Sequence, residues 1–194
     1  SLITVMSPKT VGSKRLDEAF AHLPVFTKVL FSSIAVLLGS MGQANYAAAN
    51  ASLDTFAAVQ GQQGLPTTSI QWGAWGHGTG GMAVRNQGTL ARLERMGVGT
   101  LTPEQGLVAL ITVLQQKAPA QVEVLTASPF DWCIFLGRLP PEKQAPYQAF
   151  MDVKTITSKM SDLEGANYVE ETPILDEAYS NVQDAIDEIT TAVL

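Results

Sequence analysis

Segments with strand-like and helix-like patterns alternate along the first two thirds of this chain, and this alternation restricts the fold more than any other feature. Strands that are separated by helices form a parallel sheet with helices on both faces. We therefore predict an α/β fold. The predicted elements, in chain order, are a helix over 9–23, a strand at 26–33, a helix over 45–60, a strand at 67–75, helices around 89–97 and 102–116, and a strand at 120–127.

Two details refine this prediction. Thr102, Pro103 and Gln105 stand where an N-cap, a first helical residue and a capping-box partner are expected. The segment PFDWCIFL is a short closing helical turn. Three strands make a small sheet for an open α/β domain, so we interpret residues 1–138 as the C-terminal half of a doubly wound, Rossmann-like parallel sheet.

The charge distribution changes after residue 138. Residues 139–194 hold 11 acidic residues and 3 lysines, whereas residues 1–138 hold 7 acidic and 9 basic residues, which together give the net charge of −6. The two adjacent prolines in GRLPPEKQAP, Pro140 and Pro141, interrupt regular structure at this step. We predict a domain boundary there, a linker over 139–172, and an acidic tail that is mostly helical or disordered.

The end of the tail has one apolar stripe with helical spacing. We predict an amphipathic helix over 173–194, which either begins a carrier domain, serves as a docking or dimerising element, or is simply solvated. The apolar positions of this stripe are Leu175, Tyr179, Val182, Ile186, Ile189 and Val193.

Composition excludes several function classes. No dense basic stripe is present, which argues against nucleic acid as a partner. No apolar run reaches the ~18 residues of a membrane span. A single cysteine, Cys133, and the lack of a secretory pattern at the N-terminus favour a cytoplasmic location. We expect no metal site.

The candidate chemistry lies in FSSIAVLLGSMGQANYAAAN, residues 31–50. Tyr46 and Asn50 are four residues apart on a predicted helix, so both project from one face. Ser33 ends a strand, at the sheet edge where ligands of such folds bind. Together these groups can bind and protonate a carbonyl oxygen. In the alternative interpretation, Ser33 caps a turn, Tyr46 packs and Asn50 bonds locally.

This stretch resembles the active-site signature of the short-chain dehydrogenase/reductase superfamily, and in particular of the ketoreductase domains of type I polyketide synthases. GLPTTSIQWGAWG, GVGTLTPEQGLVAL and FDWCIFL resemble later segments of these domains, so the likeness covers residues 2–137. Ordinary members of the superfamily carry Tyr-x-x-x-Lys, whereas Asn50 replaces that lysine here. In the polyketide subfamily the lysine lies in an earlier Pro-Lys pair, which SPKTVG supplies as Lys9.

The resemblance implies the roles of these residues. A lysine ammonium favours the phenolate and so makes the phenol a better proton donor. Tyr46 is then the general acid, Ser33 binds the carbonyl oxygen, and Asn50 orients the site or relays a proton. The hydride donor implied is NADPH. The substrate implied is a β-ketoacyl thioester on the phosphopantetheine arm of an acyl carrier domain, within a larger synthase.

Further residues are assigned by the same resemblance. Ser32, Trp72, Gly73 and Trp75 are expected to contact the cofactor, and Gly80, Gly81 and Met82 to form a lid over the substrate. GHGTGG, residues 76–81, also fits G-x-G-x-x-G, but no clean helix opens at its third glycine and no acid stands about 20 residues on at the end of a next strand.

The main dinucleotide fingerprint of the family precedes the region of resemblance. We therefore expect the N-terminal half of the domain to be a necessary partner, and the isolated chain to be inactive. Two alternatives remain. One is a non-catalytic, ketoreductase-like structural subdomain. The other is a free-standing reductase of fatty acid type, which YAAAN in place of Tyr-x-x-x-Lys argues against. In this family a tryptophan at one position marks one configuration of the product hydroxyl. Leu38 stands at that position here, and the absence of the tryptophan favours the D-hydroxy product.

Overall fold

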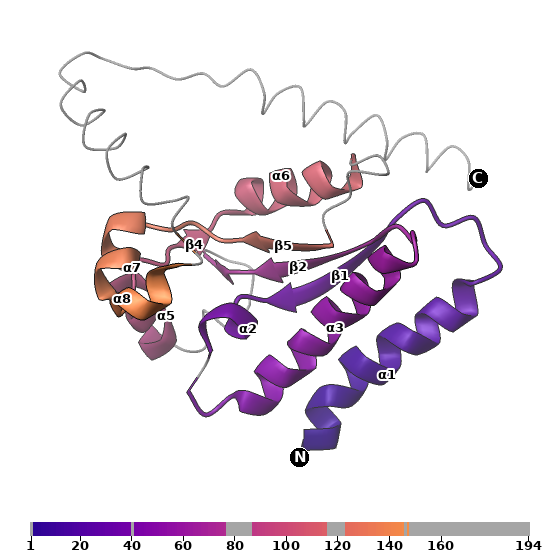
Figure 1. Ribbon diagram of the computed structural model, residues 1–194, viewed down its shortest axis with the longest axis horizontal. Coiled ribbons are helices and arrows are strands. Elements are labelled where there is room, and N and C mark those ends of the chain that lie inside the picture. The colour runs from indigo at the N-terminus through magenta and orange to yellow at the C-terminus, as the bar shows by residue number, and fades with distance from the viewer. Residues whose placement is uncertain (1, 40, 77–86, 116–122, 146, 148–194) are drawn as a thin grey trace, which may run out of the picture. The chain divides into compact units, whose positions relative to one another are not determined.

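The computed structural model describes residues 2–39, 41–76, 87–115, 123–145 and 147 (Figure 1). The chain forms two compact units, residues 1–130 and residues 131–194. Most of the predicted linker and all of the predicted tail helix lie outside the described residues, and the predicted boundaries at 138 and 172 stay predictions. No helix in the described ranges is both long and apolar enough to cross a bilayer.

The first unit is built on a parallel sheet, as predicted. The sheet order is β1-β2-β5, with Phe31 opposite Ile70 and Ile70 opposite Leu125. The central strand β2 is buried along its whole length. The strands are β1 (Lys28–Ser33), β2 (Thr67–Trp72) and β5 (Val124–Ala127).

Helices cover both faces of this sheet. Figure 1 shows α1 and α3 on one face and α6 on the other. A second, two-stranded parallel sheet joins β3 to β4. The remaining elements of this unit are α1 (Leu2–Phe20), α2 (Ala35–Leu38), α3 (Ala44–Gln62), β3 (Ala74–Trp75), α5 (Gln87–Arg95), β4 (Thr100–Leu101) and α6 (Pro103–Leu114).

Most element ends are shifted by a few residues from the sequence-based prediction, and two differences are larger. The first helix begins at Leu2 rather than Lys9 and runs through Pro8. This proline lies in the second turn, where its missing N–H removes a single intrahelical bond. The predicted strand 67–75 is divided, because the first sheet ends at Trp72 and the next strand, Ala74–Trp75, pairs with Thr100–Leu101 instead.

The apolar core of the unit lies between the sheet and α6. Its buried members are Ile70, Trp72, Leu101, Val113 and Ala127. The predicted capping box of α6 is confirmed. Thr102 Oγ1 accepts from the Gln105 N–H at 3.2 Å, and Gln105 Oε1 accepts from the Thr102 N–H at 3.0 Å.

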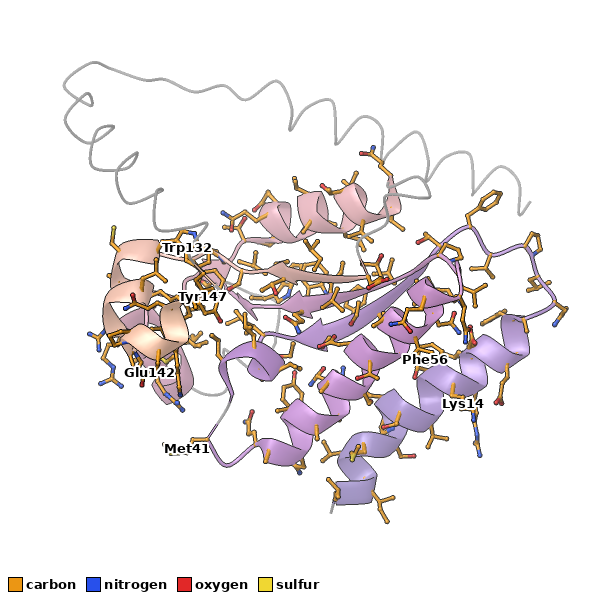
Figure 2. The ribbon with its side chains drawn as sticks, in the orientation of Figure 1. Lys14, Met41, Phe56, Trp132, Glu142 and Tyr147 are labelled. Carbon is orange, nitrogen blue, oxygen red and sulfur yellow. The ribbon has the colours of Figure 1, made fainter. Side chains whose placement is uncertain are left out.

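The second unit contains α7 (Trp132–Arg138) and α8 (Pro141–Gln144). Asp131 caps α7, because its carboxylate accepts the Ile134 N–H at 3.0 Å. The rings of Trp132 and Tyr147 lie side by side with centroids 6.3 Å apart (Figure 2). Both rings also contact buried Phe135, with centroid distances of 5.9 and 5.4 Å.

Candidate active site

Lys9 reaches from α1 to the carboxyl end of β1. Its Nζ donates a hydrogen bond to the carbonyl of Phe31 at 2.7 Å, across 22 residues of sequence. On the neighbouring residue, the hydroxyl of Thr10 accepts from Ser52 Oγ at 3.4 Å, which places this part of α1 beside the middle of α3. The predicted lysine therefore lies where α1, β1 and α3 meet.

Ser33 and Tyr46 are contributed by β1 and α3. Ser33 is the last residue of β1, is half-buried, and accepts the Ala35 N–H at 3.2 Å. This contact occupies a lone pair on Ser33 Oγ and leaves the hydroxyl proton for another partner. Tyr46 is half-buried in the first turn of α3, where the helix dipole favours negative charge.

Asn50 lies one turn after Tyr46 and is fully buried. Its Nδ2 donates to the backbone carbonyl of Tyr46 at 2.8 Å, so both residues belong to one face of α3. Its backbone carbonyl accepts from Ser32 Oγ at 3.2 Å, which ties β1 to α3. Its Oδ1 is buried without a hydrogen-bond partner within the described structure.

The charge of Lys9 is influenced in two directions. Burial lowers the pKa of Lys9 below its ordinary value, because a desolvated ammonium is less stable than a hydrated one. The carboxylate of Asp54 partly offsets this effect and raises the pKa. The ammonium is therefore held in a half-buried position by a backbone carbonyl and the field of a buried acid.

The residues expected at the cofactor have different environments. The hydroxyl of Ser32 is directed to Asn50, and the ring of Trp75 packs against α6 at Gly106. Trp72 is 7% exposed, and its ring centroid lies 5.4 Å from that of Phe31 and 5.2 Å from that of Trp75. The Trp72 indole N–H is buried without a hydrogen-bond partner in the described structure.

Gly73 sits at a close approach of two strand ends. A Cβ added at this position would lie 2.4 Å from Ser128 Oγ. Its small size is therefore required inside the protein, whether or not a cofactor contacts its backbone. The predicted lid residues Gly80, Gly81 and Met82 lie outside the described residues.

The chain is similar to known ketoreductases in sequence and in fold. The family model "KR domain" matches residues 1–77. The chain is 48% identical over 107 residues to the spectinabilin polyketide synthase system protein NorB of Streptomyces orinoci. The matched segment covers 55% of this chain and 5% of that protein. The chain is 36% identical to solved A-type ketoreductases from a modular polyketide synthase, with a TM-score of 0.62 over 72% of this chain and 29% of that one.

A solved A1-type ketoreductase is also 36% identical, with a TM-score of 0.60 over 69% of this chain and 27% of that one. Residues 1–77 match the ketoreductase domain family, and about 70% of the chain is similar to solved ketoreductases of type I polyketide synthases. The resemblance seen in the sequence is confirmed, and with it the Rossmann-like α/β fold of the short-chain dehydrogenase/reductase superfamily. The chain spans under a third of these solved ketoreductases and about a twentieth of the synthase relative.

Sequence reasoning missed one polar cluster of this ketoreductase chain. Asp54, Ser69 and Gln71 are buried together between α3 and β2, and Thr126 on β5 extends the cluster. A signal was present in the sequence, because TTSIQW places polar side chains at alternate positions of a strand that is buried on both faces.

Proposed function

We propose that this chain supplies the acid–base residues for reducing a carrier-bound β-ketoacyl thioester to the β-hydroxyacyl thioester, with NADPH as the hydride donor. The observation that carries the proposal is the contact between Lys9 Nζ and the Phe31 carbonyl at 2.7 Å. This contact brings a cation from a distant helix to the strand that ends in Ser33. The contact supports the role that the resemblance gives to the lysine of the Pro-Lys pair, which is to assist Tyr46. A lysine that projected into solvent would not support this role.

Each residue has one task in this proposal. Ser33 donates its hydroxyl proton to the ketone oxygen, where a hydrogen bond strengthens as negative charge develops. Tyr46 gives its phenolic proton to the same oxygen as the general acid. The ammonium of Lys9 stabilises the phenolate that remains. Asn50 fixes the turn of α3 that carries Tyr46 through its 2.8 Å bond to the Tyr46 carbonyl.

The carboxyl edge of the sheet suits a nicotinamide, because the buried indole N–H of Trp72 has no partner within the described structure and can meet a carbonyl oxygen. NADPH would supply the hydride at this edge. Trp72 and the backbone of Gly73 are the residues of this chain best placed to hold it, since the side chains of Ser32 and Trp75 are engaged inside the protein.

The upstream part of the ketoreductase domain is the first proposed partner. Strand β1 lies at the edge of the described sheet, and the side chain of Phe31 on it is 52% exposed. An apolar residue beside an unpaired strand edge is suited to contact with further strands and helices. The acyl carrier domain and the other domains of a synthase are the remaining proposed partners.

The test is the Tyr46→Phe substitution in the complete ketoreductase domain that contains this chain. We predict that the rate of NADPH oxidation with a β-ketoacyl thioester falls roughly 10²- to 10⁴-fold, since phenylalanine keeps the ring and removes the proton donor. Tyr147→Phe, which removes a hydroxyl from the aromatic group of the second unit, is the matched control and should react at the wild-type rate. Equal rates for Tyr46→Phe and the wild type would contradict the proposal, and a wild-type domain that binds NADPH without turnover would indicate a structural role.

A further inference from the structure

Asp54 is a buried acid to which the proposed reaction assigns no task. It is the sole carboxylic acid of α3 and is 9% exposed. Its Oδ1 accepts from Ser69 Oγ at 2.6 Å, and its Oδ2 accepts from Gln71 Nε2 at 2.8 Å. Thr126 fixes the orientation of the Gln71 amide, because its hydroxyl donates to Gln71 Oε1 at 2.8 Å. Both carboxylate oxygens therefore face donors, which is the arrangement that stabilises an anion.

Two contacts place Lys9 beside the part of α3 that carries Asp54. Ser52 bonds to Thr10, the residue next to Lys9, and lies two positions before Asp54. The carbonyl that binds Lys9 Nζ belongs to Phe31, and the next residue, Ser32, bonds to α3 at Asn50. The residue next to Lys9 and the residue next to its hydrogen-bond partner both contact the two turns of α3 that carry Asn50 and Asp54.

The other charged groups near α1 are already paired or exposed. Lys28 on β1 pairs with Asp17 at 2.5 Å, and Lys14 projects from α1 (Figure 2) in an exposed pair with Glu18 at 4.0 Å. Asp54 is therefore the acid that balances Lys9. The titratable groups of the two elements bonded to α1 are Tyr46 and Asp54 on α3 and Lys28 on β1; α1 itself adds Lys14, Arg15, Asp17 and Glu18.

We propose that Asp54 is a positioning residue of this active site, whose fixed carboxylate keeps the Lys9 ammonium charged where the Phe31 carbonyl holds it. This inference rests on the proposed function, since it concerns the state in which Lys9 assists Tyr46. Without a counter-charge, a half-buried ammonium loses its proton more readily. The carboxylate is held by Ser69 and Gln71 of β2, and Gln71 is in turn held by Thr126 of β5, so the sheet interior is linked to the proton donor at its edge.

The test is the pH profile of kcat/KM for reduction by the complete ketoreductase domain. In Asp54→Asn, Lys9 loses its proton at a lower pH, so we predict that the alkaline fall in activity moves to lower pH by about one unit. Asp54→Glu keeps the negative charge, so the alkaline fall in activity should occur near its wild-type pH. Ser69→Ala removes a bond to Asp54 but keeps the charge, so it should lower the melting temperature and leave the alkaline limb in place.

A purely structural Asp54 would give a different result. Asp54→Asn would then lower kcat/KM by the same factor at every pH, or Ser69→Ala would move the alkaline limb as far as Asp54→Asn does. Either result overturns the proposal.

A second measurement needs no variant that might fail to fold. In the wild-type domain, the Asp54 ¹³Cγ resonance should shift at the pH at which the Lys9 ¹³Cε resonance titrates, because the two charges interact. An Asp54 resonance that does not respond to Lys9 deprotonation overturns the inference. This titration is decisive even if the domain fails to reduce the thioester, so failure of the proposed function is distinguishable from failure of the Lys9–Asp54 pair.

Discussion

Adjacent serines at the end of β1 have different environments, which separates their roles. Ser32 is 5% exposed and donates its hydroxyl proton to the Asn50 carbonyl. Ser33 is half-buried and accepts a backbone N–H from Ala35. Neighbouring side chains on a strand project from opposite faces, so the two hydroxyls cannot serve the same ligand. The proton of Ser33 is therefore the better candidate for the substrate oxygen.

Ser32→Ala tests this division at the residue scale. The change removes a buried hydrogen bond, so we predict that the free energy of unfolding of the domain falls by roughly 1 kcal/mol. The Kd for NADPH should stay within about twofold of the wild type, measured by fluorescence titration. A Kd about tenfold weaker with unchanged stability would instead make Ser32 the cofactor ligand that the resemblance implies.

At the scale of elements, α6 is fixed at its start by two features. The capping box of Thr102 and Gln105 satisfies backbone donors at its N-terminus. One turn along, Gly106 allows the ring of Trp75 to lie against the helix, because a Cβ at this position would be 2.0 Å from Trp75 Cη2. The small β3–β4 sheet is thereby packed onto α6.

Gly106→Ala should destabilise the first unit, although alanine favours helices. The added methyl group displaces Trp75, so we predict a loss of about 1–3 kcal/mol in the free energy of unfolding, measured by chemical denaturation. Gly12→Ala in α1 is the matched control, since its Cβ would meet only Ser7 O at an ordinary 3.8 Å. That control should gain about 0.5–1 kcal/mol. The account of α6 packing is wrong if both substitutions stabilise the protein.

The same elements show what the sequence could and could not predict. The order of the main helices and strands, the parallel sheet and the α6 capping box follow from local patterns and were predicted, whereas the short elements α2, β4 and α8 were not. The path of α1 through Pro8 and the departure of β3 from the sheet depend on contacts with distant residues, such as the pairing of Ala74 with Thr100. The Asp54 cluster joins residues 15 and 17 positions apart, so the polar positions of TTSIQW indicate buried polar side chains but not the acid that they bind.

On the scale of the whole molecule, the candidate site is concentrated in a small part of the chain. Lys9, Ser33, Tyr46 and Asn50 all lie within the 77 residues that match the ketoreductase family model. They come from α1, β1 and α3, which are joined by the bonds of Lys9 to Phe31 and of Ser32 to Asn50. No residue of α1 is buried, so polar contacts rather than core packing set the position of Lys9.

The central claim is that Lys9 and Tyr46 act as one unit on a single ketone oxygen, and a double-mutant cycle on kcat tests it most directly. The cycle compares Lys9→Met, Tyr46→Phe and the double variant in the complete ketoreductase domain, each measured by NADPH oxidation with a β-ketoacyl thioester. When two residues act as a unit, removing either one already removes their shared contribution to kcat. The account therefore predicts that kcat of the double variant is within about threefold of that of the slower single variant. Losses that multiply, as they do for independent sites, would contradict it.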